Sequence, residues 1–447
     1  MSEPRADPPD TAAAAEAAGI WPVTALDLHA AAEPDAPGTR VVIDLRPLQE
    51  PERTPITAAY LERLLAAYAA RPLAGESFVV LLRTMRDDPA DRFEPLGLAV
   101  AGRRRVPPTA RLLRSGGLTI DSFLLRGAEI GSGRGATEDG AVGAVYHTAG
   151  GAVPLGSRLP VVATLLDLAP WELPETYARS AAARFGHRLR ARVLMDAARL
   201  IVCSPAVAES ARRTIHIRPE RIAIVPLAAD DAFTSSAAEP ERIAALRARL
   251  ELPERYLVFS GRYDARKDLS TLFSALSGLR SEAPPRGGGA WPPIVVLAGA
   301  AATTAADVAA MGRAAERFGV PDLVHLTPRL TSDELATLEA GALGFVFPSL
   351  SEGTGLAVLE ALAMGIPVVA SRAGPLPEIV AKAGIVVEPR DAARLAAALR
   401  AIWVEGAVRS QLVRQAGQRA AGPRRTWHDV ARETRAVYAE AVGSRPS

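Results

Sequence analysis

Short apolar segments that are typical of buried strands alternate with amphipathic segments along most of the chain. The first series runs from Val41 to Leu227 and comprises VVIDLR, FVVLLR, AVYHT, PVVATLLD, LIVCS and IAIVPL. Between its first two members, residues 57–70 carry Tyr and Leu side chains at helical spacing. Apolar strands that alternate with helices predict a parallel sheet with helices on both faces.

A second series of the same kind begins at Tyr256. Its apolar segments are YLVFSG, PIVVLAG, LVHLT, GFVFPS, PVVAS and GIVVEP. The helical stretches between them cover residues 268–280, 302–318, 331–341, 355–364 and 391–404. We therefore predict an α/β protein with two Rossmann-like, doubly wound domains that face an interdomain cleft. Ligands of such sheets bind outside the carboxyl ends of the strands, so residues that directly follow a strand are the candidate site residues.

The two series also set the predicted domain boundaries. Residues 1–39 are rich in Ala and Pro and are predicted to be a disordered tail. We expect an N-terminal domain over residues 40–228, a linker over 229–252 and a C-terminal domain over 253–422. Residues 423–447 are predicted to form a final helix, because TWHDVARETRAVYAEAV places apolar side chains at the spacing of a packed helix face.

The composition excludes several classes of protein. The chain has 447 residues, of which 49% are hydrophobic and 23% charged, which is typical of soluble globular proteins. Its 52 basic and 50 acidic residues nearly balance, which argues against a nucleic-acid binder. Cys203 is the only cysteine, so neither an internal disulfide nor a cysteine-based zinc site can form. Without a long apolar run or a signal-like N-terminus, we expect a cytoplasmic protein with at most peripheral contact to the inner membrane face.

The segment SEGTG follows the apolar run GFVFPS and opens a predicted helix. Gly353 and Gly355 allow backbone amides to approach a ligand closely, and a helix N-terminus attracts phosphate. Glu352 precedes this helix and Glu360 lies inside it, and a carboxylate can accept two hydrogen bonds from sugar hydroxyls. In the alternative reading, Glu360 is simply exposed on its helix and the glycines only shape the turn.

Basic residues in this chain are almost always arginine. Lys267 and Lys382 are the only two lysines among the 52 basic residues, so a retained lysine attracts attention. Lys267 lies in FSGRYDARKDL, directly after the first strand of the second series and five residues beyond Arg262. As the alternative, Lys267 starts a solvated helix and pairs with Asp264 or Asp268.

The residues of this turn resemble a known family. Glu352 and Glu360, within PSxxEGxGLxxLEAxAxGxPV, are similar to the E-x7-E motif of the retaining glycosyltransferases of family 4, which have the GT-B fold. FSGRYDARKDL resembles the family element G-R-x-x-x-x-K. The resemblance covers residues 41–440 and is strongest over 255–390. It also implies that the final helix crosses back toward the first domain.

The resemblance implies a role for each matching residue. Glu352, Arg262 and Lys267 are expected to be catalytic, with Glu352 on the sugar hydroxyls and the two cations on the donor diphosphate. Glu360 is expected to hold the ribose hydroxyls. The match also implies that the donor is bound by Gly353, Thr354, Gly355 and Leu356, and that Arg329 and Leu330 lie beside its base.

The N-terminal domain departs from the family pattern in two places. The segment TPITAAY (Thr54 to Tyr60) lacks the glycine-rich turn that the family commonly has near the donor phosphates. Leu166 stands where the family has a histidine, although the following Asp167 is present. We predict that Leu166 points into the cleft toward the turn 352–356. His147 and Asp167 are the acceptor-side candidates.

These residues lead to one main hypothesis and one alternative. The first is a retaining transferase that moves a hexose, of the mannose or glucose type, from a nucleotide sugar to a glycan or lipid-linked acceptor in envelope polysaccharide or glycoconjugate synthesis. No cofactor and no required metal are expected, because no D-x-D motif follows a strand of the second series. The alternative is a non-catalytic GT-B protein that binds a nucleotide sugar or a partner transferase, which Leu166 and the missing glycine turn favour.

Overall fold

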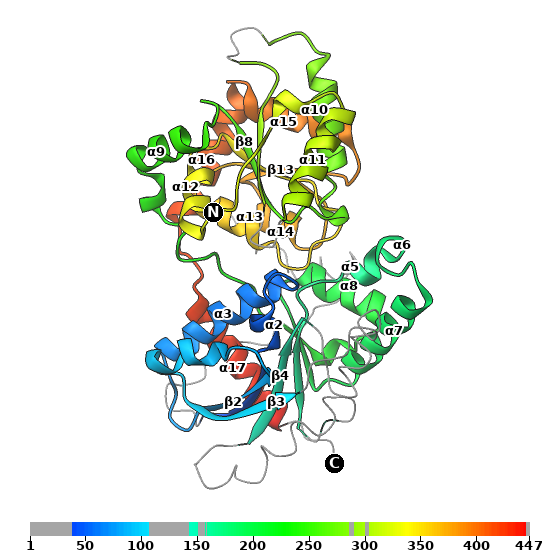
Figure 1. Ribbon diagram of the computed structural model, residues 1–447, viewed down its shortest axis with the longest axis vertical. Helices are drawn as coiled ribbons and strands as arrows, with labels where there is room; N and C mark the ends of the chain where they lie inside the picture. The colour runs from blue at the N-terminus through cyan, green and yellow to red at the C-terminus, as the bar shows by residue number, and fades with distance from the viewer. Residues whose placement is uncertain are drawn as a thin grey trace, which may run out of the picture.

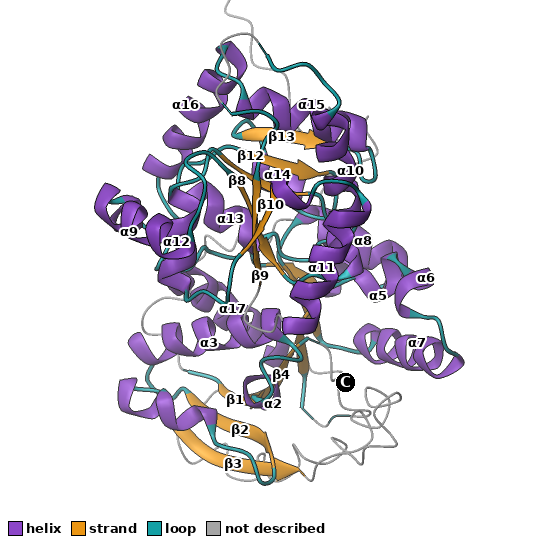
Figure 2. Ribbon diagram, turned by 45° about the horizontal axis from the view of Figure 1, so that its top comes forward, coloured by secondary structure: helices purple, strands orange, loops and turns teal. Residues whose placement is uncertain are grey.

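The computed structural model describes residues 38–106, 143–150, 157, 159–285, 290–299 and 304–443. The described chain forms two lobes, one above the other in Figure 1, and each lobe is a parallel sheet covered by helices (Figure 2). This confirms the predicted α/β class with two Rossmann-like domains. The predicted tail lies outside the described residues except for its last two positions. Within the described ranges, no helix combines the length and apolar character that crossing a bilayer requires.

The N-terminal lobe contains a seven-stranded sheet in the order β3-β2-β1-β4-β5-β6-β7, with every neighbouring pair parallel. Its strands are β1 (Arg40–Asp44), β2 (Ser77–Arg83), β3 (Val100–Val106), β4 (Ala144–Ala149), β5 (Val161–Thr164), β6 (Arg199–Val202) and β7 (Ile222–Ile224). Its helices include α2 (Arg46–Gln49), α3 (Pro55–Ala70), α5 (Ala169–Glu172), α6 (Pro174–Tyr177), α7 (Ala181–Met195) and α8 (Pro205–Ile215). The strands β1, β4, β5 and β6 are almost wholly buried, as their continuous apolar runs require.

The C-terminal lobe contains a six-stranded parallel sheet in the order β10-β9-β8-β11-β12-β13. Its strands are β8 (Leu257–Gly261), β9 (Val295–Gly299), β10 (Val324–Leu326), β11 (Gly344–Phe347), β12 (Val368–Ser371) and β13 (Gly384–Val387). Its helices include α10 (Leu269–Arg280), α11 (Ala305–Arg317), α12 (Ser332–Ala340), α13 (Leu356–Ala363), α14 (Leu376–Val380), α15 (Ala392–Trp403) and α16 (Ala407–Ala421). Because β8 and β11 are hydrogen-bonded neighbours, the segments that follow them meet at one edge of the sheet.

The predicted linker is partly structured. Residues 229–252 include the helix α9 (Pro240–Leu250), which packs against α12. Leu246 and Leu250 of α9 are buried in the core of the C-terminal lobe. The prediction of a linker over the whole of 229–252 was therefore wrong. The connection is shorter, because α9 is amphipathic and belongs to the second domain.

The last helix, α17 (Trp427–Gly443), returns to the first domain. It packs against α3, β4 and β5, and Figure 1 shows it in red inside the lower lobe. Val430, Thr434 and Val437 are wholly buried there. Arg435 of α17 pairs with the buried Glu76 at 2.6 Å, which fixes the helix at the edge of the N-terminal lobe.

Candidate active site

Lys267 and Glu352 form a buried ion pair where the segments after β8 and β11 meet. The Nζ atom of Lys267 lies 2.6 Å from Oε2 of Glu352, and both side chains are almost completely buried. The ammonium also lies 4.1 Å from the ring centroid of Phe347, the last residue of β11. Lys267 therefore pairs with neither Asp264 nor Asp268, the partners considered from the sequence. It pairs with Glu352, which belongs to the turn after β11.

The second oxygen of Glu352 faces the start of α13. Oε1 accepts hydrogen bonds from the backbone amides of Thr354 at 3.4 Å and Gly355 at 3.3 Å, and from the Thr354 hydroxyl at 3.3 Å. Burial alone would raise the pKa of Glu352, but the charges of Lys267 and Arg266 outweigh it and hold this pKa at about 2. Glu352 is thus an ionised carboxylate held by an ammonium and by helix-terminal amides, which are groups that also bind phosphate.

Arg266 belongs to the same cluster and was not singled out from the sequence. Its side chain is buried, its Nη1 lies 2.8 Å from Asp167 of the N-terminal lobe, and its Nε lies 3.4 Å from Asp264. The only signal in the sequence is its position beside Lys267, which the abundance of arginine conceals. Asp167, an acceptor-side candidate, is therefore at the contact between the lobes.

Arg262 is only partly buried. Within the part of the chain that the structure describes, it makes no hydrogen bond or ion pair. Burial raises the pKa of Tyr177 on α6, and the charge of Arg262 opposes this rise. Hydrogen bonds from Thr304 lower the pKa of Asp307 on α11, and the charge of Arg262 adds to this lowering. Arg262 directly follows β8, and its charge acts on groups of both lobes, so it is an available cation near Lys267.

Glu360 is buried and contacts the N-terminal lobe. Its Oε1 accepts a hydrogen bond from Nη2 of Arg63 at 3.1 Å, and Nε of Arg63 donates to Asp230 at 2.8 Å. Burial raises the pKa of Glu360 to about 7, with Asp230 adding to the rise and Arg63 opposing it. The alternative that Glu360 is exposed on its helix is therefore wrong. Arg63 lies on α3, 297 residues earlier in the chain, so this contact could not be predicted from the sequence.

The turn between β11 and α13 lies directly against the N-terminal lobe. A Cβ atom at Gly353 would collide with the carbonyl oxygen of Leu166, so only glycine allows this approach. The thiol of Cys203 donates to the Gly353 carbonyl, and Ser351 donates to Glu172 at 2.5 Å. Gly355 has a φ of 64° at the start of α13, a conformation that also favours glycine. The other two donor-binding candidates of this turn are Thr354, which is buried, and Leu356, which is partly buried.

The structure corrects the prediction for Leu166. Its side chain is 2% exposed and belongs to the hydrophobic core of the N-terminal lobe. Its backbone carbonyl, not its side chain, faces Gly353. The residue follows the end of β5, where strand alternation no longer determines which way a side chain points.

The structure also corrects the prediction for His147. The side chain is wholly buried, Nε2 lies 2.9 Å from the Thr164 hydroxyl, and Nδ1 lies 2.7 Å from the hydroxyl of Tyr438 on α17. Burial lowers the pKa of His147 to about 3. This histidine joins β4 to the last helix, and both of its ring nitrogens are engaged inside the N-terminal lobe.

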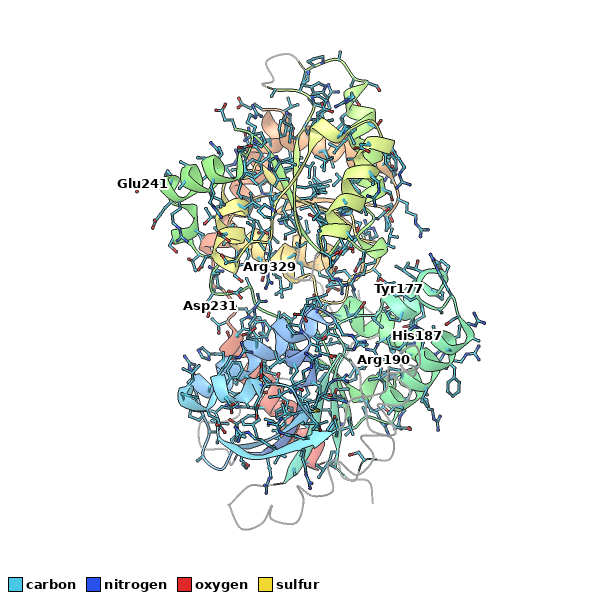
Figure 3. All side chains as sticks on the ribbon, in the orientation of Figure 1. Tyr177, His187, Arg190, Asp231, Glu241 and Arg329 are labelled. Atoms are coloured by element: carbon cyan, nitrogen blue, oxygen red, sulfur yellow. The ribbon has the colours of Figure 1, made fainter. Side chains whose placement is uncertain are left out.

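Arg329 and Leu330 lie in the connection between β10 and α12. Arg329 is exposed, and Figure 3 places it on the edge of the C-terminal lobe that faces the N-terminal lobe. Leu330 is partly buried and packs against the core of its own lobe. Among the described residues, no group of three or more His, Cys, Asp or Glu side chains is arranged to hold a metal ion.

Comparison with known proteins gives matches across both lobes. A family model described as Glycosyl transferase 4-like domain matches residues 57–228, and one described as Glycosyl transferases group 1 matches residues 254–404. A D-inositol 3-phosphate glycosyltransferase from Xylanimonas cellulosilytica is 31% identical over 303 residues, which are 66% of this chain and 68% of that protein.

Other curated relatives are matched over shorter segments. The MMP alpha-(1->4)-mannosyltransferase of Mycolicibacterium hassiacum is 39% identical over 127 residues, which are 28% of this chain and 31% of that protein. A D-inositol 3-phosphate glycosyltransferase from Streptomyces bingchenggensis is 32% identical over 216 residues, which are 44% of each chain. The chain thus spans less than half the length of these two relatives.

Solved structures share the arrangement of the two lobes. Sucrose-phosphate synthase from Thermosynechococcus elongatus superposes with a TM-score of 0.64 at 20% identity and covers 91% of this chain and 100% of its own. HepE of Anabaena in complex with UDP and glucose gives a TM-score of 0.62 at 17% identity, with coverages of 91% and 100%. WaaG, which is involved in lipopolysaccharide biosynthesis, gives 0.63 at 16%, with coverages of 88% and 98%. At these identities the likeness establishes the fold.

Proposed function

The chain belongs to the group 1 glycosyl transferases and has their GT-B fold, and on this basis we propose that it transfers a hexose from a nucleotide-diphosphate sugar to an acceptor hydroxyl with retention of configuration. The buried Lys267–Glu352 pair at the start of α13 is the observation that carries the proposal. It joins the two sequence elements that the family resemblance assigns to the donor. It does so at the carboxyl edge of a parallel sheet, where ligands bind.

The donor diphosphate binds to the groups that hold Glu352 in this structure. Lys267 and the amides of Thr354 and Gly355 already bind an anion, the Glu352 carboxylate, and Arg262 is an available cation beside them. Negative charge develops on the diphosphate as its bond to the sugar breaks. Fixed cations and helix-terminal amides stabilise that charge without needing to reorganise.

Glu352 changes partners when the donor binds. Released from the amides of α13, its ionised carboxylate accepts hydrogen bonds from hydroxyls of the transferred sugar. The bond between the anomeric carbon and the diphosphate oxygen breaks, and the acceptor oxygen forms a new bond to that carbon on the same face. The acceptor proton passes to the leaving diphosphate. This sequence requires no protein nucleophile, so the two-carboxylate scheme of retaining glycosidases does not apply.

Glu360 binds the ribose of the donor. Its carboxylate is buried at the same helix and is held by Arg63 across the lobes. Arg329 and Leu330, between β10 and α12, lie beside the base. Support for a nucleotide sugar also comes from HepE, whose structures contain UDP and UDP-glucose.

The sugar and the pathway are proposed from the relatives. A mannosyltransferase from Mycolicibacterium hassiacum and UDP-glucose-bound HepE support a hexose of the mannose or glucose type. The O-antigen chain mannosyltransferase B of Escherichia coli, 49% identical over 59 residues, supports a role in envelope polysaccharide or glycoconjugate synthesis. We further propose a glycan or lipid-linked acceptor, cytoplasmic action at or near the inner membrane face, and turnover without a metal.

A direct assay tests the proposal. Purified protein is incubated with UDP-glucose and with GDP-mannose, and free nucleotide diphosphate is followed by mass spectrometry. Release that is lost in Glu352→Gln and kept in Glu378→Gln, a variant of another glutamate of the C-terminal lobe, is the expected result. Absence of release with every donor, together with measurable UDP binding, would instead support the second candidate. That candidate is a non-catalytic nucleotide-sugar binder, which Leu166 in place of the family histidine favours.

A further inference from the structure

Three side chains in contact near the end of β5 carry buried polar atoms that have no hydrogen-bond partner among the residues that the structure describes. They are Arg190 and His187 of α7 and Trp171 of α5, and the atoms are Nε, Nδ1 and Nε1 respectively. The guanidinium of Arg190 lies over the Trp171 ring, 5.0 Å from its centroid, and the rings of Trp171 and His187 are 6.2 Å apart. Buried polar atoms are nearly always hydrogen-bonded in native proteins, so three in one contacting group indicate a missing partner.

Arg190 is a buried cation that contacts no carboxylate within the described part of the chain. It is 9% exposed, and the one hydrogen bond that it makes within the described residues runs from Nη2 to the carbonyl oxygen of Gly150 at 2.7 Å. A neutral carbonyl does not compensate the cost of burying a charge. Asp167 acts on Arg190 electrostatically, but its carboxylate is already bound by Arg266 and by the amide of Ala169. The cluster therefore has an unused capacity to bind an anion.

The position of the cluster relates it to the reaction. Gly150 directly follows β4, and Asp167 and Trp171 follow β5, so the cluster lies at the carboxyl edge of the N-terminal sheet. Figure 3 shows Arg190 and His187 close to Tyr177, on the side of the lower lobe nearest the C-terminal lobe. Arg266 reaches the same edge through Asp167, next to the Lys267–Glu352 pair. A molecule bound to this cluster would lie on the acceptor side of the donor.

The three free atoms specify the chemistry of that molecule. Arg190 and Trp171 can only donate hydrogen bonds at these nitrogens, so both require acceptor oxygens. Nε2 of His187 lies 3.2 Å from the carbonyl oxygen of Tyr177, which can only accept, so Nε2 is the donor. In the tautomer with its proton on Nε2, Nδ1 is an acceptor for a hydroxyl. We propose that Arg190, Trp171 and His187 form an acceptor subsite for a polyol that bears an anionic phosphate or carboxylate group. This inference rests on the proposed transferase function and adds the class of acceptor.

The test measures binding rather than turnover. UDP binding is measured first by calorimetry. Its absence would contradict the proposed transferase function but would not test the proposed subsite. With UDP held constant so that the donor site is filled, two matched pairs of probes are titrated: D-inositol 3-phosphate against myo-inositol, and glucuronate against glucose. The wild-type protein is expected to bind at least one anionic member about 10- to 100-fold more tightly than its neutral counterpart, the range expected for charge-assisted hydrogen bonds.

Matched variants assign the effect to Arg190. Arg190→Met should abolish the preference for the anionic probe, whereas Arg192→Met, at a position 70% exposed on the same helix, should keep it. Arg190→Lys and Trp171→Phe should each reduce the preference and do not depend on Arg190→Met folding. An equal preference in Arg190→Met and Arg192→Met, or no preference in the wild-type protein for either anionic probe, would overturn the proposal.

Discussion

Replacing Lys267 by methionine is expected to destabilise the protein strongly. The Nζ atom of Lys267 is the close partner of a carboxylate that is only 3% exposed. Its removal leaves Glu352 as a buried charge without its main counterion, although Arg266 remains nearby. Breaking a buried ion pair in this way costs about 3–5 kcal/mol. Lys382→Met is the matched control, because Lys382 is the only other lysine and is exposed.

The pKa of Glu352 gives an independent magnitude. The shift from an ordinary value of 4.5 to about 2 corresponds to ~3 kcal/mol. Because the pKa is depressed in the folded state, this stabilisation is present above pH 4.5 and is lost as the pH falls toward 2. Burial lowers the pKa of Lys267, so desolvation of the ammonium offsets part of the gain. The pair as a whole therefore contributes less than the cost of breaking it.

Urea denaturation at pH 7 and pH 5 measures the free energy of unfolding of the variants. Lys267→Met should unfold at a clearly lower urea concentration than Lys382→Met. The difference should shrink at pH 5, because Glu352 buried without Lys267 can take up a proton at this pH, whereas Glu352 of Lys382→Met keeps its ammonium partner and stays ionised. The double variant Lys267→Met/Glu352→Gln should recover most of the stability but still bind UDP about 10- to 100-fold more weakly than the wild-type protein. Equal stabilities of the two single variants, or full UDP affinity in the double variant, would refute the reasoning.

Four further outcomes are expected. Glu360→Ala should raise the donor KM with little change in kcat, because ribose contacts stabilise ground and transition states alike; a lower melting temperature at unchanged KM would make Glu360 purely structural. The pKa of about 7 for Glu360 is opposed by Arg63, so Arg63→Met should move the pH dependence of donor affinity to higher pH, as a titration of UDP affinity against pH can check. Leu166→His should cost ~1–3 kcal/mol and lower the melting temperature without raising turnover, because the side chain is in the core; greater turnover at an unchanged melting temperature would contradict this. Initial rates should be the same with and without EDTA, and a complete loss restored by manganese would show that a metal is required.

The sequence was sufficient for features that depend on continuous apolar runs and local turns. All six strands of the C-terminal sheet were predicted near their observed positions, because strands buried on both faces have uniformly apolar sequences. The turn at Glu352 was also recognisable, since a strand, two glycines and a helix occur in immediate succession. By contrast, β3 was missed. It is an edge strand whose Arg103, Arg104 and Arg105 are exposed, so it has no apolar run.

Contacts between distant segments could not be predicted. Arg63 and Glu360 are 297 residues apart, and in a chain with so many arginines nothing distinguishes Arg63 from its exposed counterparts. Arg266 was missed for the same reason. Leu166 was assigned to the cleft from a family position, whereas the side chain follows the local packing of β5 and its carbonyl contacts Gly353. Side-chain direction at a strand end depends on the tertiary structure.

The return of α17 to the N-terminal lobe affects the order in which the protein can fold during synthesis. The N-terminal sheet is complete once residue 224 has been made, but its core also requires Val430 and Val437. His147 and Glu76 likewise obtain their partners, Tyr438 and Arg435, only from the last helix. The second domain contains all of its own strands and emerges earlier than α17. On the ribosome, the N-terminal lobe is therefore completed after the C-terminal lobe, and the surface of α3 that packs against α17 stays uncovered until α17 has left the ribosome.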